Sequence, residues 1–115
     1  MLTLEEYKNK IIAFRDERDW GQFHNGKDEA LSLVLEAAEV LEHFQWKNGD
    51  EMREYMKTHK EEIGEELADV FYWVMILCNE LGLNVLDIAE RKLEKTKLKY
   101  PVEKAKGSNK KYTEL

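Results

Sequence analysis

GEELADVFYWVMILCNELG, residues 64 to 82, is the most informative segment of this 115-residue chain. The nine residues of Val70–Cys78 carry neither a charge nor a strongly polar group, and Glu65, Glu66 and Asp69 stand just before them. A helix that is apolar on every side has to be buried on every side. The segment therefore predicts a central helix whose first turns hold carboxylates beside a hydrophobic core.

Amphipathic patterns around this segment predict an all-α fold. We expect four helices, at roughly residues 2–20, 26–46, 58–82 and 84–100, with a short helical piece after the turn at 47–50. The residues expected at the N-caps are Thr3, Asn25, Thr58 and Asn84. Strand signals are absent. Short connections between these helices predict a four-helix bundle over residues 1–100, followed by a basic tail over 101–115 that begins at Pro101.

The predicted central helix needs more cover than one chain supplies. Three other helices of similar size cannot enclose it completely. We therefore expect a homodimer or homotetramer to complete the bundle. The single cysteine, Cys78, lies within the apolar run and is expected to be a buried core residue.

Charge and hydropathy exclude several classes of partner. Residues 1–90 hold nine Lys and Arg against twenty-one Asp and Glu, whereas residues 91–115 hold nine against three. The acidic body would repel a nucleic-acid polymer. No segment reaches the ~18 apolar residues of a membrane span, and the N-terminus has no apolar signal region. The sequence predicts a cytoplasmic protein without a membrane partner.

Two acidic pairs are the candidate chemical motif. Glu36 and Glu39 are three residues apart in one helix, as are Glu66 and Asp69 in the next. Side chains at this spacing lie ~5–6 Å apart at Cβ, and neither helix supplies a Lys or Arg to balance them. Taken singly, each pair is a weak signal, because most Glu-x-x-Glu pairs lie on solvated helix faces. Together they predict a site for a hard divalent cation, Mg²⁺ or Mn²⁺, that leaves room for a phosphate.

Other metal chemistries fit the residues less well. A di-iron bundle requires Glu-x-x-His motifs, and His43 stands four residues after Glu39 instead of three. The chain has no calcium-binding loop and no Cys/His set for zinc. Magnesium-assisted phosphate chemistry remains.

These acidic pairs, together with RDWGQFH, HFQWKNG, EELADVFYW and KYPVEKAKG, resemble the MazG-like all-α nucleoside triphosphate pyrophosphohydrolases, and the dCTP pyrophosphatase-like branch in particular. The resemblance extends from about Arg15 to the end of the chain. It implies a Mg²⁺-dependent hydrolase that cleaves a (d)NTP, with dCTP or a modified dCTP as candidates, to the nucleoside monophosphate and pyrophosphate in nucleotide pool sanitation.

The resemblance also implies roles for individual residues. The metal ligands would be Glu36, Glu39, Glu66 and Asp69. The substrate-binding residues would be Trp20, His24, Trp46, Trp73, Lys92 and Thr96. Lys92 would also balance charge during catalysis, and Glu65 is a candidate general base. Two positions depart from the family pattern: Thr96 replaces an Asn, and Trp73 replaces a Tyr.

Two other functions are compatible with the residues alone. A non-enzymatic helical interaction module could use the acidic faces to bind a basic partner. A phosphoribosyl-ATP pyrophosphohydrolase-like enzyme would share the bundle and the metal chemistry, so its products would have to distinguish it.

Overall fold

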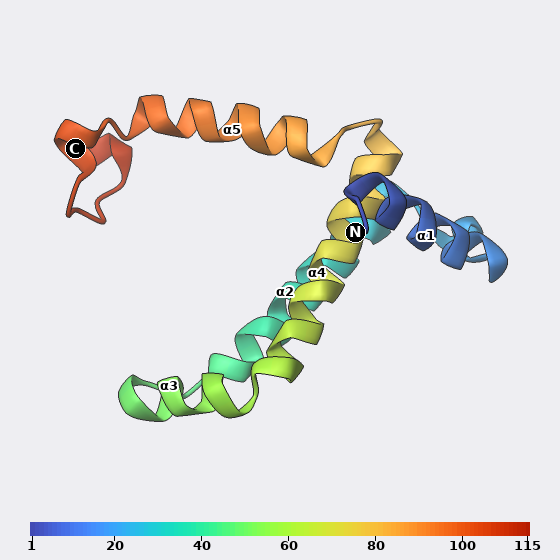
Figure 1. Cartoon of the computed structure of the whole chain (residues 1–115), viewed down its shortest axis with the longest axis horizontal. Helices are drawn as coiled ribbons and strands as arrows, with labels where there is room; N and C mark the ends of the chain where they lie inside the picture. The colour runs from blue at the N-terminus through green and yellow to red at the C-terminus, as the bar shows by residue number, and fades with distance from the viewer. The chain divides into compact units, whose positions relative to one another are not determined.

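The computed structural model describes residues 1–115 and confirms the predicted all-α fold (Figure 1). It contains no strand. In chain order the elements are α1 (Leu4–Glu17), the 3-10 turn η1 (Trp20–Phe23), α2 (Gly26–Phe44), α3 (Gly49–Thr58), α4 (Lys60–Leu81), α5 (Val85–Lys99), α6 (Val102–Ala105) and the 3-10 turn η2 (Tyr112–Glu114).

The chain groups into two units, Met1–Gly82 and Leu83–Leu115, which are described separately below. The division into a bundle domain over 1–100 and a tail over 101–115 stays a prediction. No single helix is long and apolar enough to cross a membrane, although α4 and α5 counted together reach that length and composition.

The first unit is built on the pairing of α2 with α4, which lie side by side (Figure 1). α1 packs on α4, and the rings of Tyr7 and Phe71 stack there with centroids 5.6 Å apart. The buried apolar side chains are few and come mostly from α4: Met75, Ile76 and Cys78, joined by Ile11 of α1. The predicted central helix thus supplies the core, and Cys78 is buried as expected.

Side-chain caps fix the start of three helices where the sequence predicted them. The side-chain oxygens of Thr3, Asn25 and Asn84 accept hydrogen bonds from backbone N–H groups three residues later, at 3.1, 2.9 and 3.0 Å. Each cap satisfies a donor that the first helical turn cannot pair internally.

The predicted N-cap at Thr58 is wrong. Thr58 is the last residue of α3, and its hydroxyl donates to the carbonyl oxygens of Glu54 and Tyr55 at 3.2 and 3.3 Å. A threonine hydroxyl in a last helical turn can bond backward in this way instead of capping the next helix. α4 begins at Lys60, and His59 before it makes no side-chain cap.

In the second unit, the tail folds back on the end of α5. α5 ends before Pro101, as predicted. The backbone N–H of Tyr112 donates to the hydroxyl of Tyr100 at 3.2 Å, and the ammonium of Lys99 lies 4.7 Å from the centre of the Tyr112 ring. Local aromatic and cation–π contacts therefore order a segment in which the sequence had shown no periodicity.

Candidate metal centre

Four carboxylates meet between α2 and α4. Glu36 and Glu39 come from α2, Glu66 and Asp69 from α4, and one oxygen of each lies within 4.8 Å of the others. The spacing of three residues brings each pair to one helix face, and the side-by-side packing of the two helices brings the pairs together. The structure thus gathers the four side chains that the sequence had singled out as metal ligands.

No cation of the chain balances this cluster. None of the ion pairs in the protein involves the four residues. The Oε2 atoms of Glu36 and Glu66 are buried and have no hydrogen-bond partner. Buried, unpartnered carboxylate oxygens without a neighbouring base are the donor set that Mg²⁺ or Mn²⁺ prefers, so the residues present fit such an ion.

The crowding of charge changes the acidity of two carboxyls. A hydrogen-bonding contact with Glu39, burial, and the charges of Glu39, Asp69 and Glu36 raise the pKa of Glu66 to about 7. Burial and the charges of Glu39 and Asp69 also raise the pKa of Glu36. Glu66 is therefore partly protonated at pH 7 in the absence of a cation, and a bound dication would compete with that proton.

The general-base candidate lies outside this cluster. Glu65 is exposed on α4 and is not among the four clustered carboxylates. Its role stays a prediction that rests on its position beside Glu66.

The aromatic residues proposed for the nucleobase are separated within one chain. The rings of His24 and Trp73 lie 5.3 Å apart, and Trp20 packs edge-on against Phe14 at 5.5 Å. Trp46 follows the C-terminus of α2, whereas His24 precedes its N-terminus. The 19 residues of α2 span about 28 Å, so one chain brings His24 and Trp73 together but leaves Trp46 far from them.

Trp46 has two unusual properties. Its side chain is 88% exposed, and its backbone has a φ of 69°, in the left-handed region that bulky residues rarely adopt. An exposed indole held in such a conformation is poorly explained by packing in a single chain, and strained backbone often marks a functional position.

Lys92 and Thr96 lie one turn apart on α5, in the second unit. The Lys92 side chain is exposed. The Thr96 hydroxyl donates to the Lys92 carbonyl oxygen at 2.9 Å, so in this structure it is engaged by its own helix.

One buried polar residue was not singled out by the sequence. Glu29, in the first turn of α2, is completely buried and lies beside His24. An acidic residue in a first helical turn is ordinary, because it complements the helix dipole. Its burial depends on the packing of α2 against α4, for which the sequence carries no signal.

Comparisons with known proteins identify the family to which this fold is similar. Residues 31–115 match the model of the MazG-like family. The chain is 35% identical to mouse dCTP pyrophosphatase 1 and 33% identical to the human protein, in each case over 98% of this chain and 68% of the relative. A crystal structure of a pyrophosphatase from Archaeoglobus fulgidus superposes with a TM-score of 0.82 and 39% identity, covering 85% of this chain and 92% of that one.

Proposed function

The chain belongs to the MazG-like family and is a nucleotide pyrophosphohydrolase, and we propose that it requires Mg²⁺ and cleaves a (d)NTP to the nucleoside monophosphate and pyrophosphate. We further propose dCTP or a modified dCTP as the preferred substrate, because the named relatives are dCTP pyrophosphatases. Enzymatic relatives over almost the whole chain leave no support for a non-enzymatic interaction module.

The four-carboxylate cluster is the observation that carries the proposal. Four oxygens within 4.8 Å of one another, with no base nearby, suit a divalent cation that keeps open positions for phosphate oxygens. Such an ion would polarise the phosphates and lower the pKa of an attacking water. In this proposal Glu36, Glu39, Glu66 and Asp69 hold the ion.

Two further residues are proposed to act on the phosphates. Lys92 lies with Arg91 and Lys95 on exposed turns of α5, where an ammonium can balance the charge of the leaving pyrophosphate. Glu65 is proposed as the general base because it adjoins a metal ligand and is itself exposed to water. Thr96 is proposed to contact the substrate only after its hydroxyl leaves the Lys92 carbonyl.

The nucleobase is proposed to bind among aromatic side chains from two copies of the chain. Trp20, His24 and Trp73 belong to one end of α2 and Trp46 to the other, so a single base cannot touch both groups in one chain. A second copy would bring its own Trp46 to this end. The exposed apolar residues Leu31, Val34 and Leu41 on α2 support such an association, in a homodimer or homotetramer.

Substrate and metal can be tested together. The protein would be incubated with dNTPs, NTPs and phosphoribosyl-ATP, with and without Mg²⁺, and pyrophosphate would be measured separately from phosphate. We expect pyrophosphate from a deoxycytidine nucleotide only when Mg²⁺ is present. Release of phosphate, equal turnover in a chelator, or turnover of phosphoribosyl-ATP alone would contradict the proposal. Sedimentation at several protein concentrations would test for the second copy.

A further inference from the structure

Glu29 is the only charged residue of the chain that is buried, and its side chain has no exposed surface at all. Both of its carboxyl oxygens lack a hydrogen-bond partner. Burying a carboxyl without a partner opposes folding strongly, and a leucine of similar volume would avoid that cost. A buried carboxyl at this position therefore points to a role other than stabilising the fold.

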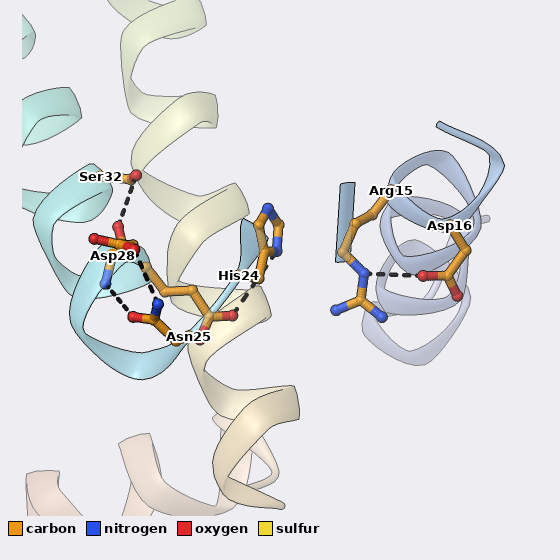
Figure 2. Close-up of polar contacts among 7 residues, drawn as sticks. Arg15, Asp16, His24, Asn25, Asp28 and Ser32 are labelled. Carbon is orange, nitrogen blue, oxygen red and sulfur yellow. Dashed lines mark hydrogen bonds and ion pairs between the residues drawn. The ribbon is translucent and has the colours of Figure 1, made fainter. Parts of the chain in front are cut away.

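The imidazole of His24 lies beside this carboxyl. The His24 Nδ1 atom lies 4.0 Å from the Glu29 Oε2 atom and is likewise buried without a partner. Figure 2 shows His24 beside the first turn of α2, with Arg15 and Asp16 on the neighbouring α1. A shift of about 1 Å would bring the two atoms within hydrogen-bond distance, and each would then have the partner that it lacks.

The other charged groups around the pair are engaged or exposed. Arg15 of α1 and Glu80 of α4 both act on it electrostatically. The Arg15 guanidinium donates to Asp16 at 3.0 Å, and the Glu80 side chain is exposed. His24 is therefore the group left to pair with Glu29.

Burial changes the pKa of both side chains in the direction of their neutral forms. Burial, followed by the charge of Arg15, lowers the pKa of His24 below its usual range. Burial, followed by the charge of Glu80, raises the pKa of Glu29. The imidazole is accordingly neutral at pH 7, and the hydrogen bond made at Nδ1 determines which state its other nitrogen adopts.

The orientation of the His24 ring affects Trp73, because the two rings are in contact. The two rings are 5.3 Å apart, and Trp73 stands one helical turn beyond the ligand Asp69 on α4. An imidazole that is free to flip or rotate would leave this face of Trp73 without a fixed neighbour.

We propose that Glu29 is a positioning residue that holds the His24 imidazole against Trp73 and thereby shapes the wall that receives the nucleobase. Glu29 is buried and touches no substrate itself. The inference rests on the proposed function, in which His24 and Trp73 line the base site. It adds a specificity-determining residue that acts through His24.

Kinetics and stability together test this role. In Glu29→Leu we expect KM for the preferred nucleotide to rise about tenfold with kcat within about twofold, while the melting temperature stays equal or rises. Glu29→Gln, which keeps an acceptor and the size of the side chain, should restore most of the affinity. A residue needed only for packing would lower the melting temperature instead. Glu42→Leu, the same change at an exposed carboxylate of α2, is the control and should alter neither quantity.

A double-mutant cycle tests whether Glu29 acts through His24. In a His24→Leu background, Glu29→Leu should leave KM unchanged, because the group that it positions is gone. A further rise of similar size in that background would overturn the proposal, as would an unchanged KM in the single variant. Glu29→Met provides the same comparison if the branched leucine prevents folding.

A measurement without substrate separates this inference from the proposed function. Nitrogen NMR of the His24 ring reports its tautomer, and the indole resonance of Trp73 reports the ring contact. We expect both signals to move in Glu29→Leu and not in Glu42→Leu. If the wild-type protein hydrolyses no nucleotide, the proposed function fails while this coupling still stands. Unmoved His24 and Trp73 signals would refute the positioning role even in an active enzyme.

Discussion

Replacing Asp69 by Asn should raise the melting temperature in metal-free buffer and lower it, relative to the wild type, in buffer that contains magnesium. At pH 7 Asp69 faces three carboxyl groups within 4.8 Å and no base, and one of them, Glu66, is about half protonated. Two unit charges at that distance repel by about 0.9 kcal/mol in a water-like dielectric. The summed repulsion from these partly protonated groups, reduced by salt, makes the relief on the order of 1–2 kcal/mol. Since 1 kcal/mol shifts the melting temperature of a domain of this size by about 4 °C, metal-free Asp69→Asn should melt about 4–8 °C above the wild type.

Magnesium should invert that order. An ion present at 100 times its dissociation constant stabilises the folded state by about 2.7 kcal/mol, which corresponds to about 10 °C for the wild type. Asp69→Asn loses one of the four ligands, so its shift should be a small fraction of this value. The two melting curves should therefore cross as Mg²⁺ is added.

The assay is thermal unfolding followed by circular dichroism at constant ionic strength, with NaCl replacing MgCl₂ in the reference buffer. Constant ionic strength separates binding from simple screening of the cluster. Glu42→Gln, which removes an exposed carboxylate from α2 outside the cluster, is the matched control and should change neither curve by more than about 2 °C. An Asp69→Asn protein that melts below the wild type without metal, or keeps the full Mg²⁺ shift, would refute the electrostatic reasoning.

Three further predictions concern the same unit of the chain. The free energy of unfolding without metal should fall as pH rises from about 4.5 to about 7. The pKa of Glu66 is about 7 in the folded protein, so the folded state binds more protons than the unfolded state over that range. Urea unfolding at several pH values should show this decrease, and Glu66→Gln should make the dependence on pH smaller. Glu39→Ala should lower kcat/KM at saturating Mg²⁺ by about a thousandfold or more with unchanged helical circular dichroism, and turnover near the wild-type level would contradict its role as a ligand. Trp46→Ala should raise KM about tenfold without lowering the melting temperature, since the side chain is 88% exposed in the single chain, and an unchanged KM would remove Trp46 from the base site.

Local signals account for most of what the sequence predicted about the fold. The uncharged run in α4 identified the core helix, and the caps at Thr3, Asn25 and Asn84 follow from hydrogen bonds within four residues. The cap at Thr58 failed because Thr58 is the last residue of α3 and its hydroxyl donates back to a carbonyl oxygen of that helix. Whether a polar side chain ends one helix or starts the next depends on where the chain turns, and sequence spacing alone does not determine it.

In the candidate site, too, local spacing predicted some features, whereas others depended on the packing of the helices. Spacing of three residues was enough to place Glu36 beside Glu39 and Glu66 beside Asp69. The two pairs meet because α2 packs on α4. The matching motifs supported this packing only indirectly. Glu29 gave no signal, because its burial arises from contacts between segments that are distant in the sequence.

The orientation of α2 links the proposed metal site to the proposed second copy of the chain. The side of α2 that packs against α4 carries Glu29, Glu36 and Glu39, whereas Leu31, Val34, Leu35 and Leu41 are 54–66% exposed. A helix in a single folded chain normally buries its apolar side and exposes its polar one. Here carboxyl side chains face α4, where a cation would bind Glu36 and Glu39, while four large apolar side chains of the same helix stay exposed in the first unit. One orientation of α2 therefore places the carboxylates beside α4 and leaves the leucines exposed. A change that rotated α2 to bury these leucines would also separate the four carboxylates.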